Sequence, residues 1–132
     1  MELLVKAVEA EAIPKLDVTD NSDPFLKIRI STSAQKWKTK TIHNTGEPVW
    51  NEEFRIPVTS SLGDILKISL YDNDHISKDD MISSREFKVR DFPIGKVIDS
   101  WYTFSPVDGV ESGGNVRLVF YLDKIGNIPD TL

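Results

Sequence analysis

The chain has 132 residues and a mass of 14.9 kDa, which suits one domain with its own core and no need of a metal or disulfide to hold it together. With 39% hydrophobic and 28% charged residues, the composition is typical of a globular protein rather than a disordered or fibrous one. The net charge of −5 argues against general nucleic-acid binding, and the absence of cysteine excludes a disulfide scaffold and a thiol nucleophile.

The N-terminal residues 1–13 lack the basic region and the long apolar run of a signal peptide, and no stretch is long enough to span a bilayer. Together with the lack of cysteine, these features predict an intracellular, cytoplasmic protein. Met1 at the start and the absence of a linker favour a complete small protein or an N-terminal domain.

Eight short segments alternate apolar and polar residues in the manner of β-strands. In chain order they cover residues 3–8, 25–31, 37–43, 53–58, 65–71, 85–89, 101–104 and 115–122. Turn-forming sequences separate them, and only residues 91–99 have room for a helical turn, which Pro93 and Gly95 keep short. The pattern predicts an all-β, eight-stranded antiparallel Greek-key β-sandwich with a frayed tail. Trp37, Trp50 and Trp101 are expected to pack in the interior.

Aspartates are concentrated in two of the predicted loops. Asp17, Asp20 and Asp23 lie in the first loop, and Asp72, Asp74, Asp79 and Asp80 follow the fifth strand. The two loops can meet at one end of a Greek-key sandwich, where carboxylates at ~4–6 Å would repel one another unless a cation were bound. Oxygen ligands on flexible loops favour Ca²⁺ over Mg²⁺ or a transition metal.

The alternative is that these aspartates are ordinary turn residues that stay solvated. An EF-hand is excluded as the source of a metal site, because Ile76, Ser77 and Ser83 occupy the positions of its third ligand, its glycine and its glutamate.

Four motifs follow one another in a characteristic order and spacing: PKLD (14–17), SDPF (22–25), PVWNEEF (48–54) and D-x-D-x-x-x-x-x-D (72–80). In these motifs the sequence resembles the C2 domain, a family of calcium-dependent phospholipid-binding modules. The resemblance implies one C2 domain over residues 1–124 with a short tail at 125–132. It also implies the permuted topology of the family, in which the ligand loops follow strands 1 and 5.

The resemblance implies a site for two or three Ca²⁺ ions. The matching carboxylate ligands are Asp17, Asp23, Asp72, Asp74 and Asp80, and the matching carbonyl ligands are Leu16, Asn73 and Lys78. Ser77 stands where the family sometimes offers a hydroxyl. The loop tips match Val18, His75 and Ile76, which allow only shallow membrane insertion because burying a valine or isoleucine contributes ~1.5–3 kcal/mol.

Basic residues alternate along the second and third predicted strands. They are Lys27 and Arg29 on one strand and Lys36, Lys38 and Lys40 on the next. Each contributes roughly 1 kcal/mol near an anionic leaflet if the two faces coincide, and otherwise they are ordinary solvent-facing residues. The resemblance implies that they line a phosphoinositide-binding groove, which Phe25 and Tyr71 flank.

The sequence therefore predicts a monomeric, non-catalytic signalling module that binds phosphatidylserine and phosphoinositides, and moves to the cytoplasmic face of membranes when calcium rises. The alternative is a calcium-independent protein-interaction or adaptor module. An enzyme using Asp72 and Asp74 would need helices and a glycine-rich loop that the sequence lacks. His43 has no evident acid–base partner in the sequence.

Overall fold

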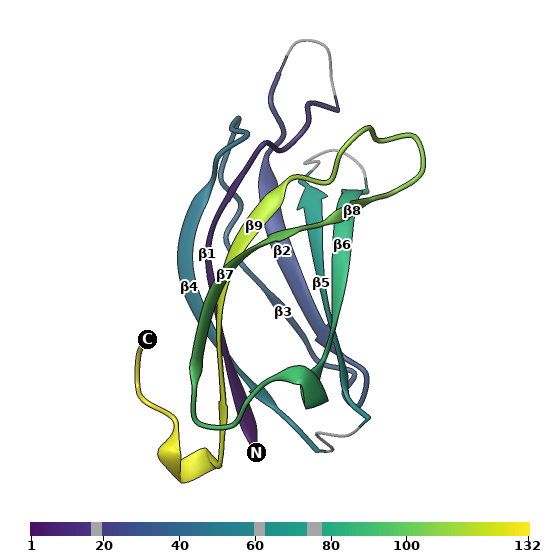
Figure 1. Cartoon of the computed structure of the whole chain (residues 1–132). Coiled ribbons are helices and arrows are strands. Elements are labelled where there is room, and N and C mark those ends of the chain that lie inside the picture. Colours follow the sequence, from purple (N-terminus) through teal and green to yellow (C-terminus); the bar gives the residue numbers. More distant parts are fainter. Residues whose placement is uncertain (17–19, 60–62, 74–77) are drawn as a thin grey trace.

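In the computed structural model, which describes residues 1–16, 20–59, 63–73 and 78–132, two antiparallel sheets pack face to face (Figure 1). Sheet A has the order β4 (Val49–Pro57), β1 (Glu2–Glu11), β9 (Asn115–Asp123) and β7 (Val97–Thr103). Sheet B has the order β3 (Lys36–Lys38), β2 (Pro24–Ile30), β5 (Ile65–Asp72), β6 (Asp80–Lys88) and β8 (Ser105–Pro106). The predicted all-β sandwich is confirmed.

The core lies between the two sheets and follows from the period of two in the strands. Alternate residues of β2, β5 and β9 are buried in one cluster, among them Leu26, Ile28, Leu70 and Phe120. Side chains of successive strand residues point to opposite faces, so the residues between them face solvent or the outer surface. Each fully buried leucine or isoleucine contributes roughly 1.5–3 kcal/mol to folding, which makes this cluster the main source of stability.

The third predicted strand is much shorter than its sequence pattern. The pattern predicts extended backbone over residues 37–43, but β3 covers only Lys36–Lys38. Thr39 ends the pairing, because its hydroxyl accepts the backbone N–H of Leu26 at 2.9 Å in place of a ladder carbonyl. The Lys40 amide then donates to the Glu52 carboxylate of β4 at 2.7 Å, whereas the Ile42 amide still donates to the Pro24 carbonyl of β2 at 3.1 Å. Beyond Lys38 the chain therefore stays beside β2 without regular ladder pairing.

Other elements also differ from the sequence pattern, since β4 and β7 each begin four residues earlier than predicted. The two-residue strand β8 was not predicted, and the helical turn expected within 91–99 lies earlier, in the 3₁₀ turn η1 (Val89–Asp91). A second 3₁₀ turn, η2 (Ile125–Asn127), follows β9. No helix among the described residues is long and apolar enough to cross a membrane.

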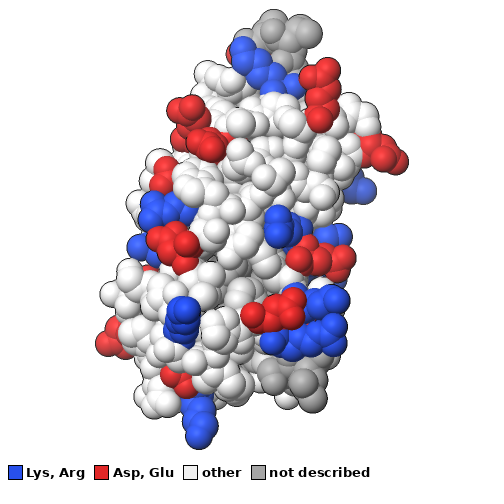
Figure 2. All heavy atoms as spheres, viewed as in Figure 1, with Lys and Arg blue, Asp and Glu red and all other residues white. Residues whose placement is uncertain are grey.

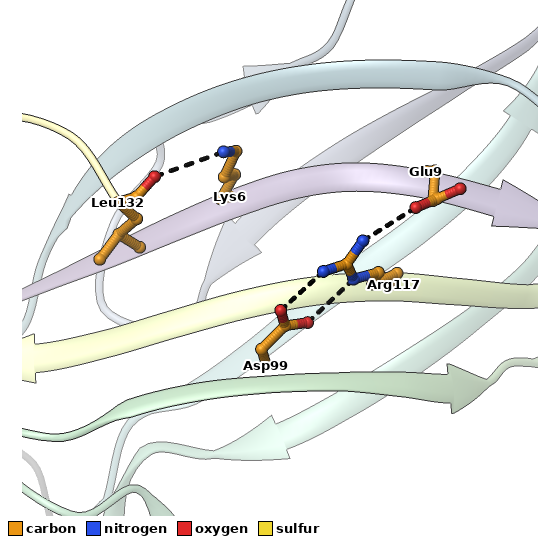
Figure 3. A network of polar contacts seen from close by, with 5 residues as sticks. All are labelled: Lys6, Glu9, Asp99, Arg117 and Leu132. Atoms are coloured by element: carbon orange, nitrogen blue, oxygen red, sulfur yellow. Dashed lines mark hydrogen bonds and ion pairs between the residues drawn. The ribbon is translucent and has the colours of Figure 1, made fainter.

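The C-terminal residues lie against sheet A, so the expectation of a frayed tail was wrong. Arg55 donates to the carbonyl of Pro129 at 2.6 Å, and the backbone N–H of Leu132 donates to Glu53 at 2.7 Å. The Lys6 ammonium also donates to the Leu132 carbonyl at 3.4 Å (Figure 3). These contacts return the chain to β1 and β4 after η2.

An ion-pair network ties three strands of sheet A together on its outer face. The Arg117 guanidinium of β9 contacts Asp99 of β7 through two N–H···O bonds of 2.8 and 3.0 Å, and Glu9 of β1 through one of 3.0 Å (Figure 3). The hydrogen bonds from Arg117 lower the pKa of Asp99. On the face drawn in Figure 2, acidic and basic side chains are interspersed rather than gathered into one-sign regions.

The three tryptophans occupy different environments. Trp50 is buried and Trp37 packs against the core, as predicted. The prediction for Trp101 was wrong, because 43% of this residue is exposed. Trp101 lies on the edge strand β7 opposite Arg117, and it therefore faces outward with the ion-pair network.

Candidate functional site

Asp23 and Asp72, from the two acidic loops, are in direct contact. The backbone N–H of Asp23 donates to Oδ1 of Asp72 at 2.9 Å, and the N–H of Asn73 donates to the Asp23 carbonyl at 3.0 Å. The register of β2 and β5 produces this contact, since Pro24 is the partner of Asp72. Asp80 is in turn the partner of Asp72 in the β5–β6 pair. The sheet therefore places three of the predicted ligand residues, Asp23, Asp72 and Asp80, at neighbouring positions of the strand register, called here the acidic end.

A third segment, between β3 and β4, closes around Asp23. The backbone N–H of Asn44 donates to Oδ1 of Asp23 at 2.6 Å, and His43 Nδ1 lies 3.9 Å from Oδ2. The Asn44 side chain accepts the N–H of Asn21 at 3.0 Å, and Asn44 itself has a φ of 53°, a left-handed conformation that asparagine tolerates. One carboxylate oxygen of Asp23 is thus held in place by the protein.

This third segment was not predicted to belong to the site. No acid–base partner of His43 is evident in the sequence, and Asn44 stands there only within a turn motif. The side chain of Asn73 also reaches this segment, donating to the Thr41 hydroxyl at 3.0 Å. These contacts join residues far apart in the chain, and no local signal beyond the turn sequence NTGEP (44–48) marks them.

Several predicted site residues lie outside the described residues. They are the ligands Asp17 and Asp74, the loop-tip residues Val18, His75 and Ile76, and Ser77. Leu16 and Lys78 are described and exposed at the flanks of the two loops. Among the residues that the structure describes, no three His, Cys, Asp or Glu side chains are grouped closely enough to hold a metal. The assignment of metal ligands therefore stays a prediction, although the oxygen donors of the acidic end fit Ca²⁺ in chemistry.

The predicted basic residues form an ordered array on the outer side of sheet B. In the β2–β3 ladder Lys27 is the partner of Lys38, and Arg29 is the partner of Lys36. Cross-strand partners share a face, and this face is the outer one because the intervening residues of β2 are buried. These four residues are called here the basic face. Lys40 is exposed but lies beyond the end of β3.

An aromatic pair joins the basic face to the acidic end. Phe25 and Tyr71 are cross-strand partners with stacked rings 5.3 Å apart. The Lys27 ammonium lies 4.5 Å from the centroid of the Tyr71 ring, and that of Lys38 lies 5.8 Å from the Phe25 ring. Phe25 is only 3% exposed, so it supports the surface from below, whereas Tyr71 forms part of it.

The β-sandwich agrees with a family comparison. The model of the C2 domain family matches residues 1–104. The chain belongs to the C2 domain family. Membership of this family supports phospholipid and membrane binding for the chain as a class of activity.

The chain spans less than a quarter of the length of the two curated relatives described here. It is 30% identical over 132 residues to human cytosolic phospholipase A2 delta, covering 99% of this chain and 16% of that protein. It is 31% identical over 103 residues to synaptotagmin-1 of Aplysia californica, covering 76% of this chain and 24% of the relative. The calcium-bound structure of the paired C2 domains of extended synaptotagmin 2 matches with a TM-score of 0.78 and 27% identity, over 91% of this chain and 44% of the other.

Proposed function

We propose that this C2 domain binds anionic phospholipid membranes reversibly and that the binding depends on calcium. The observation that carries the proposal is the hydrogen bond from Asp23 to Asp72, two acidic residues 49 positions apart in sequence. Extended synaptotagmin 2 is calcium bound in the solved structure that resembles this chain, which supports the same ion here.

The residues of the acidic end would hold the ions. Asp23, Asp72 and Asp80 supply carboxylates, with Asp17 and Asp74 of the same loops and the carbonyls of Leu16, Asn73 and Lys78 completing the set. Each bound Ca²⁺ supplies two positive charges and coordination positions that a lipid phosphate can occupy. The backbone N–H groups of Asn44 and Asp23 donate to the carboxylates of Asp23 and Asp72 and orient them, so less ordering is needed when an ion binds.

Charge explains why membrane binding would follow calcium. Without the ion, the carboxylates of the acidic end repel an anionic leaflet, and they lie next to the basic face that is attracted to it. Two or three ions would cancel this repulsion without any movement of the sheets. The basic face with Tyr71 would then contact phosphoinositide headgroups, through charge-assisted hydrogen bonds to their phosphates.

The remaining features belong to the same proposal. We expect a non-catalytic monomer of the permuted C2 topology, located in the cytoplasm at low calcium and on the cytoplasmic face of membranes at high calcium. The similar human protein is named cytosolic phospholipase A2 delta. This name agrees with a protein located in the cytosol and with a phospholipid as its partner.

Sedimentation with phosphatidylserine vesicles tests the proposal. The domain should pellet with vesicles in calcium and remain in solution with a chelator, and Asp72→Asn combined with Asp74→Asn should abolish the pelleting while the far-UV circular dichroism is unchanged. The matched control is Asp79→Asn, which removes a neighbouring acid outside the proposed ligand set and should retain binding. A domain that remains in solution both with and without calcium would instead favour the calcium-independent protein-interaction or adaptor module.

A further inference from the structure

A surface hollow bordered by Arg29 of the basic face and by Lys67 lies at the other end of sheet B. The hollow has a volume of about 400 Å³ and is lined by Arg29, Ile30, Ser31, Ser33, Ile65, Lys67 and Glu86. It begins where β2 ends, whereas the acidic end lies where β2 starts. The seven residues of β2 span ~20 Å at the usual rise per strand residue, so the two places are well separated.

The charges around the hollow are set by the strand register. Arg29 is the partner of Lys67 in the β2–β5 pair and of Lys36 in the β2–β3 pair, which places three cations in one row across β3, β2 and β5. The fourth member of the row is Glu86, the partner of Lys67 on β6. Neither Lys67 nor Glu86 takes part in the salt bridges found among the described residues. The row carries a formal charge of +2.

Two serine hydroxyls add hydrogen-bond donors to the hollow. The Ser31 oxygen accepts the backbone N–H of Ile65 at 2.9 Å, and the Ser33 oxygen accepts that of Gln35 at 3.1 Å. A hydroxyl that accepts such a bond still has its own proton to donate. Within the described part of the chain, neither proton is donated to another group. Both protons therefore remain for an acceptor in the hollow, and the Ser31 hydroxyl is held firmly because Ser31 and Ile65 bond in both directions.

We propose that this hollow binds a phosphate monoester. The planar guanidinium of Arg29, the Lys67 ammonium and the two hydroxyls supply N–H and O–H donors, and a phosphate supplies several strong acceptors in a compact tetrahedron. Glu86 opposes the bound anion and limits its affinity. The site is separate from the proposed calcium site and uses Lys67, Ser31 and Ser33, which lie outside the basic face.

The phosphate can come from a soluble metabolite or from a lipid headgroup. The ~20 Å between the hollow and the acidic end favours the soluble source when the domain is docked through its calcium loops. A lipid headgroup would need the domain to lie with sheet B along the membrane. Phosphate binding in the hollow does not depend on calcium, so it can succeed or fail independently of the proposed calcium site, although Arg29 belongs both to the hollow and to the basic face.

A titration with glycerol 3-phosphate, followed by amide NMR in the presence of a calcium chelator and at constant ionic strength, tests the site. The amide signals of Ser31, Ser33 and Ile65 should shift in a saturable manner, and glycerol alone should leave them unchanged. Lys67→Gln should weaken the apparent affinity about fivefold, because one cation at close range is lost. Glu86→Gln should strengthen it by a similar factor, which a loss of folding could not produce.

Lys124→Gln is the matched control, since it removes an exposed lysine far from the hollow in sequence and outside its lining. Sedimentation with phosphatidic acid vesicles in chelator distinguishes the two sources. Pelleting that depends on Lys67 would assign the site to lipid, and saturation by glycerol 3-phosphate without pelleting would assign it to soluble phosphates. Absence of both, or an affinity that Lys67→Gln and Glu86→Gln leave unchanged, would overturn the proposal.

Discussion

At the scale of single residues, backbone donors determine how the charged side chains of this domain are arranged. Asp72 and Asp23 each accept a backbone N–H from a segment distant in sequence, at 2.9 and 2.6 Å. Hydrogen bonds to an ionised carboxylate are stronger than those between neutral groups, and they orient the acceptor. The same principle applies to Asp99, whose charged donor is a side chain instead.

The Asp99–Arg117 pair should make stability depend on pH in the acid range. The pKa of Asp99 is lower in the folded protein than its ordinary value of 3.8, chiefly because Arg117 donates to its ionised form. The pair therefore stabilises the fold above pH 3.8, and this contribution is lost as the pH falls through the lower folded value.

Urea unfolding between neutral pH and pH 2 measures this effect. The free energy of unfolding of the Asp99→Asn variant should be lower than that of the wild type at neutral pH, and the difference should shrink in acid. Because Asp99 is half-exposed, we expect a neutral-pH difference of only about 1 kcal/mol or less. Asp108→Asn, in an exposed turn, is the control, and a difference that stays constant with pH would contradict the role of the pair.

At the scale of elements, strand register determines the functional surfaces. The β2–β3 pair places Lys27 beside Lys38, and the β2–β5 pair places it beside Ser69. The Lys27 ammonium also lies over the Tyr71 ring, so the cations and this ring form one continuous surface. A shift of the β2 register by one residue would turn Lys27 and Arg29 toward the core and Leu26 and Ile28 toward solvent. The buried alternate residues of β2 therefore also maintain the basic face.

Removing two cations from this surface should weaken phosphoinositide binding selectively. Lys27→Gln combined with Lys38→Gln removes both residues that lie over the aromatic rings, whereas calcium ligands are left intact. We expect ~2 kcal/mol less binding energy for phosphoinositide vesicles, from roughly 1 kcal/mol for each basic residue, and a smaller loss for phosphatidylserine vesicles.

Vesicle sedimentation at fixed calcium and ionic strength measures both affinities. Lys88→Gln combined with Lys124→Gln makes the same change of net charge elsewhere on the surface and serves as the control. Equal losses for the two lipids, or equal losses for the two double variants, would show that the basic face acts only through general charge.

At the scale of the whole molecule, we expect the like charges of the acidic end to lower the stability of the metal-free domain. A ligand that binds only the folded state stabilises it by mass action, by ~2.7 kcal/mol for each site at a hundredfold excess over its dissociation constant. Calcium at that excess should therefore raise the Tm of the wild type by roughly 10 °C for each ion bound, as the size of the domain implies.

Scanning calorimetry with calcium, with magnesium and with a chelator checks this expectation. The variant with Asp72→Asn and Asp74→Asn should melt at or above the metal-free wild type, since repulsion is relieved, and calcium should not raise its Tm. A lower Tm for the metal-free variant would indicate that these aspartates have a structural role instead.

The sandwich, its strand positions and the two acidic loops could be predicted from the sequence, because alternation and turn chemistry are local properties. The length of the third strand could not, since Thr39 ends it through a hydrogen bond to Leu26 on the neighbouring strand. The exposure of Trp101 could not be predicted either, because an aromatic residue is compatible with both the inner and the outer face of a strand.

The sequence by itself determined the class of fold, the family and the acids and bases that serve the candidate sites. The tertiary structure alone decided that Asp23 contacts Asp72, that Asn44 joins them and that Lys67 with Arg29 borders a separate hollow. The physical reason is that hydrophobic periodicity specifies which residues are buried, whereas contacts between distant loops depend on the register of the strands that carry them.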